Sequence, residues 1–181
     1  IMEPVEFPEL KKPERPAHPW ALTGARGRKK NIVTSLFLVP EDLERENQKL
    51  QTIIQEIEAH EVRYAEYMMD DAEVVVVAYG TSGRIVQTAI KQARAEGVRV
   101  GLFRPISMFP FPYEQLRRAA RNAQHILVVE LSAGQMIEDV RLALCDAHPI
   151  TFFGRTGGMV PLPDDVLVEI KKLASNQGDP R

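Results

Sequence analysis

The sequence has almost no cysteine, since Cys145 is the only one among its 181 residues. One thiol excludes an internal disulfide framework, a Cys-x-x-Cys redox pair and an iron–sulfur cluster held by cysteines of this chain. Scarce cysteine also fits a reducing compartment, so we expect a cytoplasmic protein. Cys145 lies late in a predicted helix beside Leu144, where it is expected to be a small core residue rather than a nucleophile.

An excess of charge of one sign is also lacking. The chain has 23 basic and 25 acidic residues, a net charge of −2, and no basic stripe, so neither nucleic acid nor an anionic membrane is expected as a partner. Its apolar runs are strand-length, far short of the roughly 20 residues that a membrane span requires. The start, IMEPVEFPEL, does not resemble a signal peptide, and Ile1 in first place indicates part of a longer polypeptide.

Motifs for catalysis and metal binding are missing. The four histidines are scattered without HxH or HExxH spacing, and there is no GxSxG, GxGxxG or GxxxxGK[ST] sequence. We therefore expect no catalytic residue and no metal ligand in this chain. A hydrophobic content of 44% is enough for one good core, so we expect one domain with additional segments.

Three zones follow one another along the chain. Residues 1–40 form a proline-rich arm or interdomain linker, in which NIVTSLFLV (31–39) fits either a short strand or a docking segment. Residues 41–72 repeat apolar side chains every seven residues and predict an amphipathic helix of about eight turns. A helix laid against its own domain or a partner subunit is favoured over a free coiled coil, because Asn47 and Glu61 occupy alternate seam positions.

Residues 73–181 alternate between strand and helix patterns. The expected strands are 73–79, 98–103, 125–130 and 150–154, and the expected helices are 83–96, 113–122, 135–146 and 164–174. The run EVVVVAY is typical of a parallel strand that is covered on both faces. This alternation predicts an α/β three-layer sandwich with a mostly parallel sheet.

Ligands of open α/β sheets bind beyond the carboxyl ends of the strands, so the loops that follow the strands hold the candidate site. The candidate ligand or interface residues are Gly80, Thr81, Ser82, Arg84, Arg104, Glu130, Gln135 and Arg155. In GTSGR, a turn with Gly80 and a cap from Ser82 or Thr81 is favoured over an anion or channel contact. For Glu130, pairing with Arg104 or Arg155 is favoured over a role as an acid or base. The loop GRTGGMVP fits an interface and an anion clamp equally well.

Four blocks occur in order along the chain: YGTSGRIVQTAI, VGLFRPISMFPFP, ILVVELSAGQMIEDVRLAL and FFGRTGGMVPLPDDV. They resemble the C-terminal, transketolase-C-terminal-like domain of the α subunit of 2-oxoacid:ferredoxin oxidoreductases. The stretches PWALTGARGRKKNIVTSLFLVPEDLE and EIEAHEVRYAEY resemble the linker of the branched-chain type, which acts on 3-methyl-2-oxobutanoate (2-ketoisovalerate). The resemblance extends from about Pro19 to Leu173.

The resemblance implies oxidative decarboxylation of a 2-oxoacid to an acyl-CoA, with coenzyme A as co-substrate and ferredoxin as electron acceptor. It implies thiamine diphosphate, Mg²⁺ and iron–sulfur clusters in the holoenzyme, and none of them on this chain, which lacks the family's GDG…N motif and cluster cysteines. The implied partners are the remaining domains of the α subunit, the β subunit and other subunits. The implied role is assembly, with coenzyme A positioning. Two alternatives remain: a freestanding flavodoxin-like module for small anions or nucleotides, and a helical dimerisation module.

Overall fold

The computed structural model describes residues 7–9, 12, 14, 16–145 and 147–175. These residues divide between Gln55 and Glu56 into two compact units, and each is described by itself below. We call the described residues up to Gln55 the arm-and-helix unit and those from Glu56 onward the sheet unit. Helix α1 (Pro40–His60) crosses the division.

The sheet unit contains a five-stranded, mostly parallel sheet, as predicted. Its strands are β1 (Tyr64–Tyr67), β2 (Val74–Ala78), β3 (Val100–Pro105), β4 (His125–Glu130) and β5 (Ile150–Gly154). They lie side by side in the order β1-β3-β2-β4-β5. All neighbouring pairs are parallel except β1 and β3, which are antiparallel.

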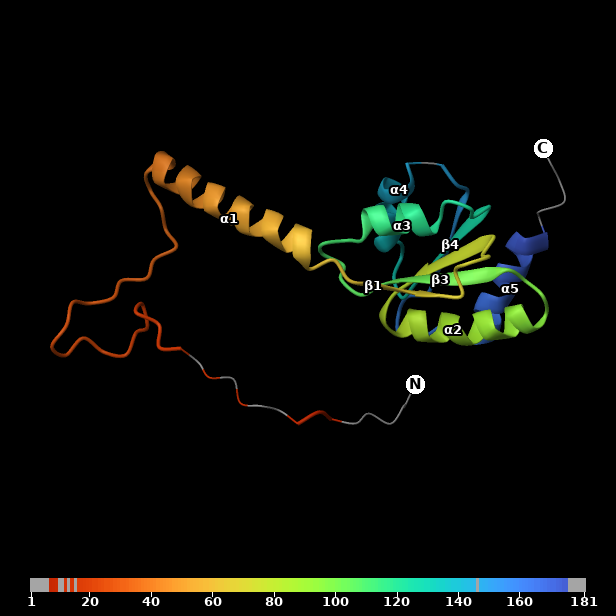
Figure 1. Cartoon of the computed structure of the whole chain (residues 1–181), viewed down its shortest axis with the longest axis horizontal. Helices are drawn as coiled ribbons and strands as arrows, with labels where there is room; N and C mark the ends of the chain where they lie inside the picture. Colours follow the sequence, from red (N-terminus) through yellow and green to blue (C-terminus); the bar gives the residue numbers. More distant parts are fainter. Residues whose placement is uncertain (1–6, 10–11, 13, 15, 146, 176–181) are drawn as a thin grey trace. The chain divides into compact units, whose positions relative to one another are not determined.

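Helices cover both faces of this sheet and complete the predicted three layers. Helices α2 (Gly80–Ala95) and α5 (Pro163–Ser175) lie on one face, and α3 (Tyr113–Ala119) and α4 (Met136–Leu144) lie on the other (Figure 1). Alternate residues of β2 divide between the two layers. Val75 and Val77 join the core under α3 and α4, whereas Val74 and Val76 join the core under α2 and α5. The continuous valine run thus reflects a strand buried on both faces.

The predicted helix over residues 41–72 is wrong in its second part. Helix α1 ends at His60, and Tyr64–Tyr67 form β1 on the edge of the sheet. In this strand Tyr64 lies opposite Pro105 in the antiparallel register, and its ring stacks on Phe103 with centroids 5.3 Å apart. The seven-residue repeat continues through Tyr64, but the open edge of β3 supplies backbone partners and ring contacts that an exposed helical turn lacks.

The other element boundaries differ from the predictions by a few residues. Helix α2 begins at Gly80 instead of residue 83, and β3 begins at Val100 instead of residue 98. Strands β4 and β5 have the predicted bounds. Cys145 is exposed at the end of α4 with a left-handed backbone (φ 49°), so its predicted place in the core is wrong.

The arm-and-helix unit has no regular element in its described residues before α1. Local contacts organise part of it, since the Asn31 side chain donates hydrogen bonds to the carbonyls of Pro19 and Ala21, and His18 stacks on Trp20. Residues 31–39 form no strand, so the first of the two predicted alternatives is wrong, and the docking segment stays a prediction. None of the α1 residues is buried.

Candidate functional site

The loops after β2, β3, β4 and β5 all leave the same edge of the sheet, as predicted. These strands are mutually parallel, and their ends are aligned in register, with Ala78 opposite Val129 and Glu130 opposite Gly154. We call this the carboxyl edge. All eight predicted site residues lie on it, in two adjoining groups: one around the start of α2 and one around the start of α4.

The first group is formed by the GTSGR turn. Gly80 has φ +54°, which favours glycine, and it starts α2 directly after Tyr79. No side chain caps the helix, so the predicted cap from Ser82 or Thr81 is wrong. Ser82 is buried, whereas Thr81 and Arg84 are exposed.

Arg104 packs against this turn from the end of β3. A Cβ atom on Gly83 would lie 3.3 Å from both Cδ and Nε of Arg104, so the glycine leaves room for the guanidinium stem. The Nε atom of Arg104 is buried and has no hydrogen-bond partner among the described residues. Arg104 is therefore a half-buried cation without a paired carboxylate in the described part of the chain.

The second group is organised by Glu130, whose side chain is fully buried. Its carboxylate accepts hydrogen bonds from the backbone N–H groups of Gln135, Met136 and Ile137 at 3.0–3.1 Å and from the Ser132 hydroxyl at 2.8 Å. These N–H groups belong to the start of α4 and have no partner within the helix. The predicted pairing of Glu130 with Arg104 or Arg155 is wrong, because the N–H groups and the dipole at the start of α4 stabilise the carboxylate instead.

Arg155 joins the second group through its backbone rather than its side chain. Its N–H donates to the carbonyl of Glu130 at 3.1 Å, whereas its guanidinium lies 3.4 Å from Asp165 and over the ring of Phe153. Its Nε atom is buried without a hydrogen-bond partner among the described residues. Gln135 is exposed and precedes α4 as the N-cap residue.

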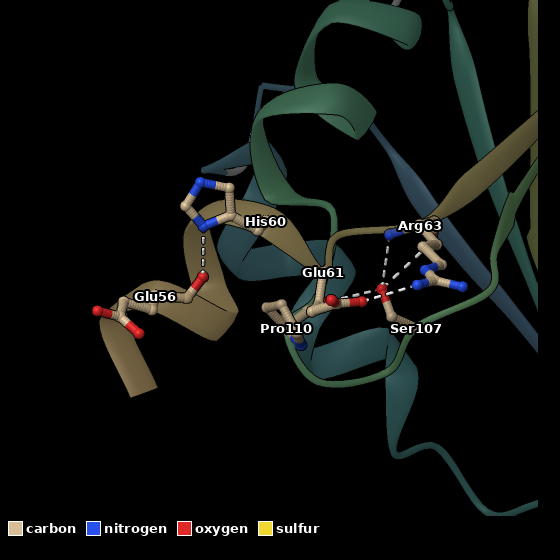
Figure 2. A network of polar contacts seen from close by, with 6 residues as sticks. All are labelled: Glu56, His60, Glu61, Arg63, Ser107 and Pro110. Atoms are coloured by element: carbon tan, nitrogen blue, oxygen red, sulfur yellow. Dashed lines mark hydrogen bonds and ion pairs between the residues drawn. The ribbon is translucent and has the colours of Figure 1, made fainter. Parts of the chain in front are cut away.

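The loop after β3 is held by a serine that sequence reasoning missed. The Ser107 hydroxyl donates to the carbonyl of Pro110 at 2.8 Å and accepts from the backbone N–H of Arg63 at 2.9 Å (Figure 2). Backbone N–H groups of Ile106 and Ser107 also donate to the carbonyl of Arg63. The segment that leads into β1 is thus fastened to the carboxyl edge. A lone serine in a loop carries no sequence signal for such a link.

A groove of about 500 Å³ lies beside this loop. It is lined by Glu58, Val62, Met108, Phe109, Pro110, Phe111, Tyr113, Glu114, Gln115 and Asp139, and by none of the eight predicted site residues. The Tyr113 hydroxyl donates to Asp139 at 2.6 Å. This hydrogen bond, followed by burial, raises the pKa of Tyr113 to about 12.

Large apolar side chains are exposed on three of the four carboxyl-edge loops. They are Ile106, Met108 and Phe109 after β3, Leu131 after β4, and Met159, Val160 and Leu162 after β5. Together with Arg84, Arg104 and Arg155 they give the edge an apolar surface with three cationic groups. Such a combination is typical of a surface that another protein surface covers.

The described residues do not form a site for a metal ion or an iron–sulfur cluster. Among the described residues, no group of three His, Cys, Asp or Glu side chains is placed to hold a metal ion. One cysteine cannot ligate an iron–sulfur cluster, which takes four ligands. Likewise, within the described residues, no helix has the length and apolarity to cross a membrane.

Comparison with known proteins identifies the class. Residues 72–166 match the family described as pyruvate:ferredoxin oxidoreductase core domain II. This match covers β2 to the start of α5, and the chain belongs to that family.

Relatives of this chain are subunits of a ketoisovalerate oxidoreductase, a 2-oxoglutarate synthase and a pyruvate synthase. The chain is 45% identical over 99% of its length to the ketoisovalerate oxidoreductase subunit VorB of Methanothermobacter thermautotrophicus, and 43% identical to that of Methanothermobacter marburgensis. It covers 51% of each of these two relatives, so it spans about half their length. Over 56% of the chain it is 38% identical to the 2-oxoglutarate synthase subunit KorA of M. marburgensis, and it covers 27% of that relative.

Two solved structures share the fold. A 2-oxoglutarate:ferredoxin oxidoreductase from Magnetococcus marinus, with 2-oxoglutarate, coenzyme A and succinyl-CoA bound, superposes with a TM-score of 0.65. It is 17% identical, over 76% of this chain and 24% of that one. A split-gene transketolase, an inactive β4 tetramer, superposes with a TM-score of 0.53 at 20% identity, over 62% of this chain and 41% of that one. The transketolase-C-terminal-like fold is confirmed.

Proposed function

We propose that this chain is the C-terminal part of the α subunit of a thiamine-diphosphate-dependent 2-oxoacid:ferredoxin oxidoreductase, acting on a branched-chain oxoacid. Identity of 45% to a ketoisovalerate oxidoreductase subunit over almost the whole chain supports the substrate class. The reaction converts a 2-oxoacid and coenzyme A to an acyl-CoA and carbon dioxide. Ferredoxin as the electron acceptor, Mg²⁺ and iron–sulfur clusters on other domains or subunits, and a cytoplasmic location are part of the proposal.

In this proposal the sheet unit serves assembly of the enzyme. The observation that carries it is the carboxyl edge, whose loops expose large apolar side chains and also carry Arg104 and Arg155. The Glu130 carboxylate on this edge accepts hydrogen bonds from the start of α4. A site for proton transfer or nucleophilic attack needs a base within hydrogen-bond reach of a reacting group. The one fully buried carboxylate of this edge is committed to holding a helix, so the edge suits docking to other domains of the α subunit and to the β subunit.

Arg104 supports a second role for the same edge, the positioning of coenzyme A. Its guanidinium has no partner carboxylate in the described chain, and it packs against the first turn of α2. Phosphate groups are bound by arginine and by helix N-termini because both present N–H donors and positive charge. Arg104 would hold a phosphate of coenzyme A, whereas Arg155, which already faces Asp165, would contact a neighbouring domain.

The test uses a complete subunit in which this chain replaces the matched half of the Methanothermobacter thermautotrophicus VorB subunit, assembled with its partner subunits. We expect this complex to oxidise 2-ketoisovalerate in preference to pyruvate and 2-oxoglutarate, measured by coenzyme A-dependent reduction of an electron acceptor. A complex of normal stoichiometry that oxidises none of the three acids would overturn the proposal.

Arg155→Ala tests the docking role. The Arg155–Asp165 pair is more than one-third exposed on both sides, so its loss should change the stability of the isolated chain by less than about 1 kcal/mol. Assembly of the complex should weaken about tenfold, measured by titrating partner subunits in size-exclusion chromatography. Lys172→Ala, which removes an exposed pair with Glu169 on α5, serves as the control and should leave assembly unchanged. Equal assembly by both variants would refute the docking role of Arg155.

A further inference from the structure

The arm-and-helix unit has many exposed apolar side chains of its own. Its large exposed apolar side chains are Phe7, Trp20, Leu22, Ile32, Val33, Leu36, Leu38, Val39, Leu43, Leu50 and Ile53. Single exposed apolar residues are common on proteins, but so many within about fifty residues are typical of a surface that is covered in the assembled protein.

Helix α1 presents its apolar residues on one stripe. Leu43, Leu50 and Ile53 recur at the spacing of a single helix face, and all three are exposed by 44–51%. The opposite face carries Gln48 and Thr52. A helix with a defined apolar face and no buried residue gains its stability from packing on another surface.

The segment before α1 has unused backbone groups. Between Asn31 and Leu38 the main chain makes no hydrogen bond to another main-chain group among the described residues. The segment contains β-branched and large aliphatic residues, and Ile32, Leu36 and Leu38 are 70–84% exposed. Such a segment can dock on another protein through backbone hydrogen bonds and apolar contacts together.

The length of the relatives indicates what covers this surface. The match to the VorB subunits extends over 99% of the chain, so it includes the arm and α1, yet it accounts for only 51% of those subunits. The two relatives therefore contain about as much polypeptide again, joined to the matched region within the same subunit. That polypeptide is tethered to the matched region by the chain connection, which gives it a high effective concentration.

Charge argues against a second α1 helix as the surface that covers the stripe of α1. Helix α1 has six carboxylates, at Glu41, Asp42, Glu44, Glu46, Glu56 and Glu58, and two basic residues, at Arg45 and Lys49. Two such helices packed on their apolar stripes would bring like charges together. The arm has the opposite sign, with Arg26, Arg28, Lys29 and Lys30 within five residues. The fitting surface is therefore apolar, with basic groups beside α1 and acidic groups beside the arm.

We infer that residues 20–39 and the Leu43–Leu50–Ile53 stripe of α1 dock on the half of the same subunit that lies outside the matched region of the relatives. The inference rests on the proposed function in one respect, that this chain is part of an α subunit, and it is independent of the oxoacid that the enzyme uses. It assigns the arm a binding role in place of a passive linker.

Hydrogen–deuterium exchange compares the 181-residue chain alone with the chimera, the complete subunit in which this chain replaces the matched half of the Methanothermobacter thermautotrophicus VorB subunit, without its partner subunits. We expect backbone amides of residues 31–39 to exchange at least tenfold more slowly in the chimera, because docking removes them from water. Leu50→Asp/Ile53→Asp in the chimera should abolish this protection. Gln48→Asp/Thr52→Asp adds the same two charges on the opposite face and should retain it.

Unprotected exchange of residues 31–39 in a chimera whose sheet unit remains protected would overturn the inference. It would also be overturned if the chain alone formed a dimer that Leu50→Asp/Ile53→Asp dissociates, since a second copy would then be the occupant. Loss of protection in both double variants would show that added charge, not the apolar stripe, is decisive, and would overturn it as well. None of these readouts depends on enzyme activity, so a failed oxoacid assay leaves them valid.

Discussion

The two units of this chain contain the same kinds of aliphatic side chain, but the sheet unit buries them and the arm-and-helix unit exposes them. In the sheet unit, Leu127 is fully buried between the sheet and its helices, whereas Leu50 on α1 is 48% exposed. The sheet unit supplies its own covering layers, because each of the strands β2 to β5 is followed by a helix that folds back over the sheet. The described arm-and-helix unit has one helix and no second layer. An apolar pattern thus indicates burial, but the burying surface need not belong to the same chain.

Matched leucine substitutions give the largest expected difference between the units. Leu127→Ala should lower the free energy of unfolding by about 2 to 5 kcal/mol, because it leaves a cavity in a fully buried layer. Leu50→Ala should change it by less than about 0.5 kcal/mol, since the side chain is half exposed. Urea unfolding of the 181-residue chain, followed by circular dichroism, measures both. Similar losses for the two variants would show that α1 is packed within the isolated chain.

Glu130→Ala tests the buried carboxylate within the sheet unit. It removes the acceptor for three backbone N–H groups at the start of α4, and we expect a loss of about 2 kcal/mol in the free energy of unfolding. The control is Glu138→Ala. Glu138 is an exposed residue in the first turn of α4, so its loss should lower the free energy of unfolding by less than about 0.5 kcal/mol. If both variants unfolded at the same urea concentration, the hydrogen bonds of Glu130 would not stabilise the fold. Its carboxylate would then be available for another role on the carboxyl edge.

Tyr113→Phe gives the smallest effect and a pH signature. Loss of the hydrogen bond to Asp139 should cost about 1 kcal/mol at neutral pH. The folded pKa of Tyr113 is raised from 10.0 to about 12, so its contribution to stability is complete below pH 10 and is lost as the pH rises toward 12. The variant should therefore lose less stability than the wild-type chain over this interval.

Urea unfolding at a series of alkaline pH values measures this difference. Tyr67→Phe is the control, because the Tyr67 hydroxyl makes no hydrogen bond with the described residues. If the wild-type chain and Tyr113→Phe lost the same amount of stability between pH 10 and 12, a raised pKa of Tyr113 would be excluded.

Local sequence patterns predicted most of the sheet unit but few of its side-chain contacts. The valine run of β2 and the apolar run of β4 could be placed because continuous burial leaves a strong signal. The position of the eight site residues on one edge followed from the parallel alternation. The partners of these residues could not be predicted from the sequence. Glu130 accepts hydrogen bonds from the backbone of α4 and Arg155 pairs with Asp165, and both contacts depend on orientations set by packing.

The sequence by itself determined the alternation of strands and helices and the common edge of the four loops, because these depend on residue type and periodicity. Only the tertiary structure decided where α1 ends, which residues form β1 and what neutralises Glu130. For α1 and β1 the deciding partners are distant in sequence: Pro105 lies opposite Tyr64 in the register, and Ser107 bonds to the backbone of Arg63. For Glu130 the partners are close in sequence, but their orientation depends on how the loop after β4 folds. A periodic pattern records which side chains avoid water, but it does not record which distant backbone groups are free to bond with them.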